Sequence, residues 1–540
     1  MAGQPAMITD PRKEHTKGKQ ALYANIAAAK AIANIVKTTL GPKGMDKMLV
    51  NAVGDIVLTN DGAMILRGMD IENPTAKMIV EIARTQEDIA GDGTTSAAVL
   101  AGSLLEKAEE LIDSGIHPTI IIKGFLQAAD KASELLDNYA IDVTKENTEV
   151  LLKIAKTAIA GKGAEAYGDL ISELCVDAAL EVEVDGKVNV NDSILITQDP
   201  GQSITETELL EGIVINKARL HSAMPDVVEN AKIVLISADI MVQKTKNKST
   251  FQINSADQLT DFLKKEEEDF HKLLDKIIDT GANVVVGTKN IDQNAADYFQ
   301  KKGIFAIRRI NDDNVKSISR ATGAHIVKNI NDVSEKDLGY AGLVEQIGAF
   351  DLGKTYFRDC QGAKTVTLLL RGSTEHVTDN LERTIDDALQ VIKNGIEDEK
   401  IVPGGGAAEI EVAQGLRAFA STIGGREQLA ISAFAEAIES IPKEIAVNAG
   451  MDGIDTILSL RAKHGEIKNA GLDVYTGEIS DALEKGIVDP LRVKKQAIKS
   501  ASEVANMVLR VDDMLKSQRR EMMDVNPEHN IHNYDALGSL

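Results

Sequence analysis

The chain has 540 residues, of which 60 are Lys or Arg and 83 are Asp or Glu, so its formal net charge is -23. This length predicts several domains, and a hydrophobic content of 43% is sufficient to build their cores. The negative charge and an aromatic content of only 3% argue against a nucleic acid or an anionic membrane surface as the main partner.

Targeting, membrane and disulfide signals are missing from the sequence. The amino terminus lacks the basic and apolar pattern of a signal peptide, and no apolar run approaches the length of a membrane span. The two cysteines, Cys175 and Cys360, lie far apart without metal-ligand spacing, which favours two inert thiols in a reducing compartment. These features predict a cytoplasmic globular protein.

An alanine-rich helix is predicted over residues 20–40, and it ends where Gly41 and Pro42 interrupt the pattern. The tight loop that follows carries Lys43. By itself this loop is typical of a helix C-cap. Beside a second glycine loop, the Lys43 side chain and the backbone of Gly41 would become candidate phosphate contacts.

A β-hairpin is predicted where the runs 55–59 and 63–66 are joined by Asn60, Asp61 and Gly62. Asn, Asp and Gly tolerate the positive φ angles of tight turns. Asp61 would lie at the tip of this hairpin, and turn chemistry alone explains its presence there.

Residues 91–96, with the sequence Gly-Asp-Gly-Thr-Thr-Ser, separate two helical patterns and predict a loop that opens a helix. The unpaired N–H groups of a helix start, together with glycines that allow close approach, suit an anion. Asp92 would repel a phosphate unless a divalent cation bridged the two, so the combination suggests a nucleotide with magnesium. An N-capped helix without a ligand explains the same residues equally well.

Two further glycine loops follow. Lys162, between Gly161 and Gly163, could reach a terminal phosphate, although a solvated lysine in a turn is the commoner arrangement. Residues 403–406, Pro-Gly-Gly-Gly, precede an alanine-rich helix, and their bare backbone could admit a flat ring or a sugar. A flexible joint is the alternative.

The middle of the chain predicts a separate α/β domain. Strand-like runs occupy 187–196, 232–237, 283–287, 304–308 and 324–328, and helices are predicted over 292–302 and 312–322. This alternation is typical of a parallel sheet covered by helices. Residues 241–278 form a long polar crossover, which is either a projecting arm or an ordinary surface helix with a basic loop.

Residues 348–355 match the P-loop pattern, but no helical periodicity follows Lys354 and Thr355, so the context argues against a P-loop. A later helix carries Asp386 and Asp387 beside its apolar stripe, a position typical of solvent-facing acids. The helices after residue 407 resemble those of the first 140 residues, so both chain ends are expected to form one domain around an inserted middle. Residues 524–540 are expected to be a disordered tail.

The glycine motifs at 40–48, 59–62, 91–96, 161–163 and 403–406, in this order, resemble those of the chaperonins across nearly the whole chain. The residues of these motifs and the charged insertion at 241–278 resemble the group II branch, which includes the archaeal thermosome and the eukaryotic cytosolic chaperonin. The resemblance implies a multidomain α/β fold. An equatorial ATPase domain would cover 1–145 and 405–523, an intermediate domain 146–215 and 370–404, and an apical domain 216–369.

The resemblance also implies roles for individual residues with ATP and Mg²⁺ as cofactors. Asp92 would hold the metal, Lys162 would face the terminal phosphate, and Asp387 would position the attacking water, with Asp386 as the alternative and Asp61 as a second water-orienting acid. Further nucleotide-binding positions would be Gly41, Pro42, Gly91, Gly93, Thr94, Thr95, Ser96, Gly161, Gly405, Gly406 and Asp489.

By similarity, the protein would be an ATP-driven folding chamber of stacked, eight-membered rings of identical or paralogous subunits. Non-native polypeptides would be its clients, and the arm at 241–278 would serve as a built-in lid in place of a separate cochaperonin. Two other classes of function remain as alternatives at this stage: an ATP-independent holdase or ring scaffold, and a conventional P-loop enzyme that uses Lys354.

Overall fold

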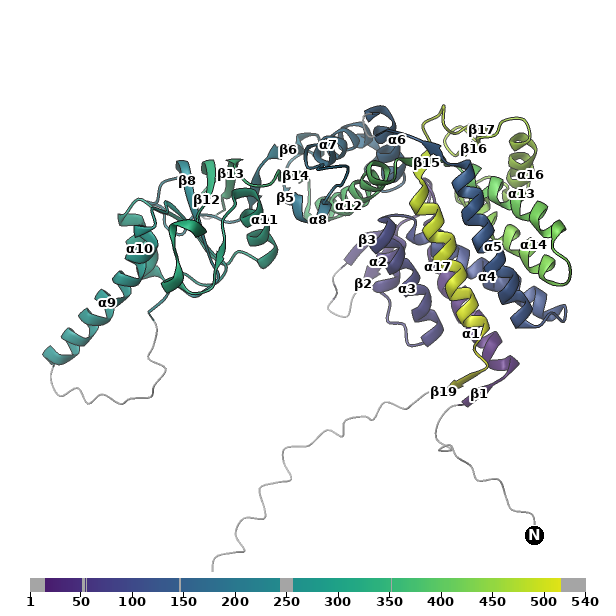
Figure 1. Cartoon of the computed structure of the whole chain (residues 1–540), viewed down its shortest axis with the longest axis horizontal. Coiled ribbons are helices and arrows are strands. Elements are labelled where there is room, and N and C mark those ends of the chain that lie inside the picture. The colour runs from purple at the N-terminus through teal and green to yellow at the C-terminus, as the bar shows by residue number, and fades with distance from the viewer. Residues whose placement is uncertain are drawn as a thin grey trace, which may run out of the picture.

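The structure of the chain, a computed structural model, describes residues 15–50, 54, 56–144, 147–242, 256–350 and 352–515. These residues form three packed units that follow one another along an arch (Figure 1). We call them the helical unit, the middle unit and the outer unit. Their buried side chains gather in separate clusters: one large and two small clusters in the helical unit, one in the middle unit and one on each face of the outer sheet. The prediction of a multidomain α/β fold is confirmed.

The helical unit contains segments from both ends of the chain. Its helices are α1 (Lys19–Lys37), α2 (Gly62–Arg67), α3 (Pro74–Ala90), α4 (Thr94–Asp113), α5 (Pro118–Tyr139), α13 (Ala407–Thr422), α14 (Glu427–Ile438), α15 (Ser440–Asn448), α16 (Gly453–His464) and α17 (Leu491–Leu509). Phe125 of α5 meets Phe434 of α14 edge to face, with ring centroids 5.5 Å apart. The two chain ends also pair directly, as antiparallel strands β1 (His15–Lys17) and β19 (Asp513–Leu515).

Small residues bring the helices of this unit close together. A Cβ atom added to Gly102 of α4 would lie only 2.4 Å from Cβ of Ala33 in α1. Alanine and glycine therefore allow a backbone approach that larger side chains would prevent.

The middle unit joins α6 (Thr148–Ile159), α7 (Gly168–Glu181) and α12 (Glu375–Asp398) to a three-stranded sheet. In that sheet β14 (Val366–Gly372) runs parallel to β5 (Ile194–Pro200) and antiparallel to β6 (Glu208–Glu211). A second small sheet, β18 (Val488–Pro490), β15 (Lys400–Pro403) and β4 (Ile141–Asp142), forms where the chain passes to the helical unit. The short elements α8 (Val190–Ser193), η1 (Glu165–Tyr167) and η2 (Ile204–Glu206) complete the connections.

The outer unit is a seven-stranded sheet. Six strands follow the order β10-β9-β8-β12-β13-β7, and β11 pairs with the C-terminal end of β8. Its strands are β7 (Ile213–Ile215), β8 (Val227–Ile236), β9 (Val284–Gly287), β10 (Phe305–Ile307), β11 (Ile326–Val327), β12 (Gly339–Ile347) and β13 (Lys354–Cys360). Strands β8 to β11 are parallel, as the βαβ pattern predicts, and the helices α10 (Gln293–Lys301) and α11 (Asp312–Thr322) lie close to their predicted positions. The other half, β12, β13 and β7, is antiparallel and was not predicted.

Helix α9 (Ala256–Asp279) extends away from the outer unit (Figure 1). It occupies the second half of the predicted arm at 241–278. Residues 243–255 of that arm and the tail predicted at 524–540 lie outside the described residues. Short elements complete the chain: η3 (Ile330–Asp332) and η4 (Glu335–Asp337), and the strands β16 (Ala470–Asp473) and β17 (Glu478–Asp481) of the helical unit.

Two predicted strands are wrong. The hairpin expected at 55–66 is instead formed by β2 (Lys47–Val50) and β3 (Ile56–Thr59), while residues 63–66 lie in helix α2. The carboxylate of Asp61 accepts hydrogen bonds from the N–H groups of Ala63 and Met64, so it caps a helix where the sequence suggested a turn. Within the run 187–196, Val190–Ser193 forms the short helix α8, and the strand begins only at Ile194.

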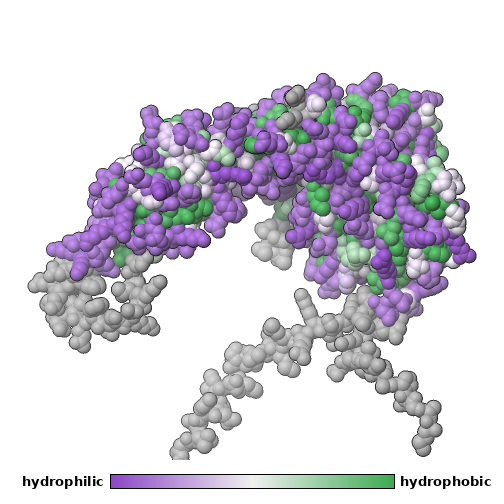
Figure 2. All heavy atoms as spheres, in the orientation of Figure 1, coloured by the Kyte–Doolittle hydropathy of each residue, from purple (hydrophilic) through white to green (hydrophobic). Residues whose placement is uncertain are grey.

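The molecule presents mostly hydrophilic residues on the visible face, with smaller groups of hydrophobic residues on the outer unit as well as on the helical unit (Figure 2). Among the described residues, no helix combines the length and apolar composition that crossing a membrane requires.

A polar network links the middle and outer units. Lys354, only 8% exposed, is the first residue of β13, and its ammonium group lies 2.6 Å from Oδ1 of Asp199 at the end of β5. Arg371 of β14 binds Oδ2 of the same carboxylate at 2.8 Å and Glu208 at 3.0 Å. Because Lys354 begins a strand and pairs with Asp199, the P-loop-like pattern at 348–355 does not have P-loop geometry.

We expect Asp199→Ala to destabilise the protein by about 2–4 kcal/mol, because it leaves the shielded cations of Lys354 and Arg371 without their shared partner. The midpoint of thermal unfolding would fall by several degrees. Asp313→Ala is the control: it removes an ion pair with Lys316 whose side chains are 89% and 67% exposed, so the midpoint should hardly change. Equal effects of the two substitutions would contradict this account of the junction.

Candidate functional site

The loop 91–96 connects α3 to α4 through two glycines with positive φ angles. Gly91 (φ 71°) ends α3, and Gly93 (φ 82°) directly precedes the first residue of α4. The side chain of Gln86 holds the loop by donating to the carbonyl of Asp92 at 2.7 Å and to that of Val493 at 3.1 Å. The prediction that this loop opens a helix is confirmed.

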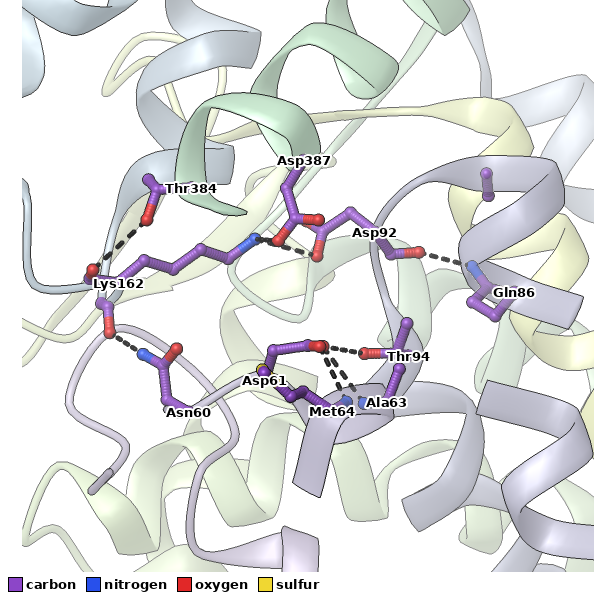
Figure 3. A network of polar contacts seen from close by, with 12 residues as sticks. Asn60, Asp61, Ala63, Met64, Gln86, Asp92, Thr94, Lys162, Thr384 and Asp387 are labelled. Atoms are coloured by element: carbon purple, nitrogen blue, oxygen red, sulfur yellow. Dashed lines mark hydrogen bonds and ion pairs between the residues drawn. The ribbon is translucent and has the colours of Figure 1, made fainter. Parts of the chain in front are cut away.

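Asp61 lies directly beside the start of α4. The hydroxyl of Thr94 donates to its Oδ1 at 3.0 Å, while the carboxylate also caps α2 (Figure 3). A Cβ atom on Gly62 would come within 2.5 Å of Oγ1 of Thr95, so the two helix starts are in close contact. Asp61 is therefore a component of the site and not a hairpin tip.

Lys162 connects this region to the middle unit. Its ammonium group lies 2.6 Å from Oδ2 of Asp387 on α12 and 3.4 Å from Oδ1 of Asp92 (Figure 3). The side chains of Lys162 and Asp387 are only 17% and 22% exposed. One cation thus joins two carboxylates from separate units.

Burial and charge act in opposite directions on this pair. Burial raises the pKa of Asp387, and the negative charges of Asp92 and Asp61 raise it further, whereas Lys162 lowers it. Burial alone would lower the pKa of Lys162, but Asp387 and Asp92 outweigh that effect and raise the pKa. Two carboxylates therefore contact one ammonium group, and the nearby carboxylate of Asp61 adds to the acids that surround it.

Helix α12 is fitted closely against loop 91–96. A Cβ atom on Gly91 would lie 2.2 Å from Cβ of Gln390, and the amide of Asn394 donates to the carbonyl of Ala90 at 2.7 Å. The middle unit therefore packs against the backbone of Gly91, just before Asp92. Only glycine, which has no side chain, leaves room for this contact.

The opposite end of the site is formed by the triple glycine. Gly405 (φ 61°) and Gly406 (φ 86°) precede α13, and a Cβ atom on Gly405 would lie 2.8 Å from the carbonyl oxygen of Leu472. Close by, the ammonium group of Lys494 lies 2.9 Å from both Asp489 and Glu409. Burial raises the pKa of Asp489, although Lys494 opposes the shift.

These loops surround a cavity of about 580 Å³, a volume within the range of small-molecule sites. Its lining includes these predicted positions: Gly41, Pro42, Asp61, Asp92, Gly93, Thr94, Thr95, Ser96, Gly161, Lys162, Gly405, Gly406 and Asp489. Gly91, Asp386 and Asp387 are not part of the lining. Asp387 nevertheless contacts Lys162, which lines the cavity, while Asp386 is exposed.

A scan of protein families matches residues 32–519 of the chain to the TCP-1/cpn60 chaperonin family. The chain belongs to this family. Similar relatives include a thermosome subunit of Pyrococcus abyssi, 49% identical over 96% of both chains, and thermosome subunit beta of Methanothermobacter thermautotrophicus, 48% identical over 95% of both. Thermosome subunit 1 of Haloferax volcanii is 47% identical over 95% of this chain and 92% of the relative. The resemblance to the group II chaperonins is confirmed.

Several contacts of this chaperonin site were not predicted. Lys43 does not line the cavity, and its ammonium group lies 5.9 Å from the centroid of the Tyr475 ring instead. Gln86, Glu409 and Lys494 were missed, since each lies within a helix and acts through contacts with distant segments. The position of Glu409, in the first turn of a helix after a glycine loop, is the only local signal that could have singled it out.

We expect Gly91→Ala to destabilise the chaperonin by about 2–5 kcal/mol, because it combines a left-handed backbone with a collision against the stem of Gln390. Gly115→Ala is the matched control, since Gly115 has φ 82° but no atom within 4 Å of an added Cβ. The midpoint of thermal unfolding should fall further for Gly91→Ala. Equal losses would mean that α12 does not depend on this close approach.

Proposed function

We propose that this chaperonin subunit is a magnesium-dependent ATPase that couples the hydrolysis of ATP to ADP and phosphate to the folding and release of non-native polypeptides. The observation that carries the proposal is the contact of Lys162 with both Asp387 and Asp92. It joins a carboxylate of the middle unit to the helix-opening loop of the helical unit. Chemistry at this point would therefore respond to the relative position of the two units.

The first turn of α4 is suited to the phosphates. Its N–H groups, including those of Thr94, Thr95 and Ser96, lack intrahelical partners and lie at the positive end of the helix dipole. The loop of Gly161 packs beside it, since a Cβ atom there would lie 2.8 Å from Cα of Pro42. We assign Gly41, Pro42, Gly91, Gly93 and Gly161 to the backbone around the phosphates.

The donor set fits magnesium. Asp61, Asp92 and Asp387 outnumber the single ammonium of Lys162, so a divalent cation would balance their charge. In the part of the chain that the structure describes, no group of three or more His, Cys, Asp or Glu side chains is arranged to hold a metal alone. Magnesium commonly binds one or two carboxylates together with phosphate oxygens, and Asp92 is our protein ligand. When bound, the ion would neutralise charge on the phosphates.

We assign Asp387 to the attacking water. Once Lys162 turns toward a terminal phosphate, the Asp387 carboxylate would be free to accept a hydrogen bond from a water and orient it. Asp61, which accepts a hydrogen bond from Thr94, would be the second acid that orients this water. The exposure of Asp386 supports Asp387 over its neighbour.

The triple-glycine end is suited to the nucleoside. Gly405 and Gly406 offer backbone without side chains, and the carboxylate of Asp489 is held by Lys494 at the cavity wall. We assign these three residues to the ribose and base. The lysine keeps the Asp489 side chain fixed in one orientation.

We also propose that the helical, middle and outer units correspond to equatorial, intermediate and apical domains with boundaries close to those that the resemblance implies, except that β7 (Ile213–Ile215) lies in the outer sheet and all of β14 (Val366–Gly372) in the middle sheet. Their separate cores and the polar network between the middle and outer units support this division. Helix α9 would belong to a built-in lid, with no separate cochaperonin. Stacked rings of eight subunits in the cytoplasm, with identical or paralogous neighbours, complete the proposal.

Asp387→Ala tests the assignment of the water-orienting acid. We expect the variant to bind ATP with nearly unchanged affinity but to hydrolyse it about 100-fold more slowly or worse, because the attacking water loses its carboxylate. Steady-state phosphate release and nucleotide binding measure the two effects. Asp386→Ala is the control and should keep nearly normal turnover; the opposite result for the two variants would overturn the assignment.

Asp92→Asn tests the metal site. In the unmodified protein, removing magnesium with EDTA should weaken ATP binding, and in the variant this difference should shrink, because the amide no longer supplies a charged ligand. Binding isotherms with and without magnesium give both affinities. An unchanged magnesium dependence would contradict Asp92 as the ligand. Magnesium-dependent hydrolysis that is coupled to the release of a refolded client would rule out the alternative of an ATP-independent holdase or ring scaffold.

A further inference from the structure

The backbone of Lys162 is held by the same helix that binds its side chain. Its carbonyl oxygen accepts a hydrogen bond from the amide of Asn380 at 3.0 Å and a longer one from the hydroxyl of Thr384 at 3.4 Å. Asn380, Thr384 and Asp387 lie on α12 at intervals of four and three residues, which brings them to one face of the helix. Lys162 is thus attached to α12 at both ends.

The loop of Lys162 needs such support. Its flanking residues, Gly161 (φ 84°) and Gly163 (φ 77°), both adopt the left-handed conformation, and glycine restricts the backbone least of all residues. On the other side, the amide of Asn60 donates to the carbonyl of Gly161. With four rotatable bonds in the lysine side chain, the position of the ammonium group depends on where the backbone is held.

Asn380 is the principal holder of this backbone. The Thr384 hydroxyl has one hydrogen and already lies 2.9 Å from the carbonyl of Asn380 within the helix, so its longer contact to Lys162 is shared. Neither Asn380 nor Thr384 lines the cavity. They would therefore act on a bound nucleotide only through Lys162.

We propose that Asn380 is a positioning residue that sets the reach of the Lys162 ammonium group toward the terminal phosphate, and so sets the preference of the site for ATP over ADP. This inference rests on the proposed function, in which Lys162 faces that phosphate. Because the carbonyl of Lys162 is bound to α12, the backbone of the lysine moves with Asp387 and the middle unit. When the ammonium group leaves Asp387 for a terminal phosphate, the hydrogen bond from Asn380 would remain and would communicate the presence of that phosphate to α12.

The test compares the affinities of Asn380→Ala for ADP and for an ATP analogue with a non-hydrolysable imido bridge. Loss of the hydrogen bond should weaken binding of the ATP analogue about 3- to 10-fold, while ADP affinity, which does not involve Lys162, stays within about twofold. His376→Ala, an exposed position on the same helix, is the control and should change neither affinity. Equal weakening of both nucleotides, or of neither, would overturn the proposal.

A double-mutant cycle separates positioning from a general structural effect. Lys162→Met should itself reduce the preference for the ATP analogue, and adding Asn380→Ala to it should have no further effect. A further loss in the double variant would overturn the proposal. If Lys162→Met leaves the preference for the ATP analogue unchanged, the proposed role of Lys162 fails, and the positioning role of Asn380 fails with it. If Lys162→Met reduces the preference but Asn380→Ala does not, only the positioning role of Asn380 is rejected.

Thr384 provides a second, conservative comparison should Asn380→Ala prove unstable. Thr384→Val keeps the shape of this nearly buried side chain but removes its hydroxyl, whereas Thr384→Ser keeps the hydroxyl. We expect a smaller loss of ATP preference, about two- to threefold, for Thr384→Val and restoration by Thr384→Ser. A loss of the same size in both would show that packing, and not the hydrogen bond, is responsible.

Discussion

The arrangement of the site depends on the contacts that the ammonium group of Lys162 makes with two carboxylates. This group lies between Asp387 and Asp92, and Asp387 follows Lys162 by 225 residues in the chain. Without a cation here, the carboxylates of Asp61, Asp92 and Asp387 would repel one another in a largely buried position. The contact therefore stabilises the docking of α12. A bound phosphate and metal would take the place of these lysine–carboxylate contacts.

The docking of α12 depends in turn on features with no charge of their own. Gly91 leaves room for the stem of Gln390, and Asn394 satisfies the carbonyl that ends α3. Farther out, Asp199 links the middle and outer units through polar contacts, while each unit keeps its own apolar core. Units with separate cores and polar junctions can shift relative to one another at a modest cost, because no large apolar surface must be exposed.

The sequence predicted the features that local patterns determine. Loop 91–96 opens a helix because its glycines, acid and hydroxyls are the residues that a helix start requires, and the parallel half of the outer sheet follows from its βαβ alternation. Asp61 was misread because Asp favours both turns and helix N-caps, and only the burial of Ala63, Ile65 and Leu66 decides between them.

Contacts between residues that lie far apart in the sequence were not predicted. Asp387 lies beside an apolar stripe and looks like a solvent-facing acid until α12 meets Lys162. The same holds for Glu409 and Lys494, whose pairing with Asp489 needs two helices from different segments to meet. The chaperonin motifs identified the site residues by resemblance, but the contacts of Asn380, Gln390 and Asn394 on α12 became visible only in three dimensions.

A crystal structure with magnesium, ADP and aluminium fluoride, a mimic of the transferring phosphoryl group, would show whether Asp387 and Lys162 complete the site from the middle unit. We expect magnesium to contact Asp92, the Lys162 ammonium group to bind the fluoride group, and Asp387 to contact a water in line with it. A structure in which the nucleotide is bound while Lys162 remains paired with Asp387, or in which the metal lies away from Asp92, would contradict this expectation.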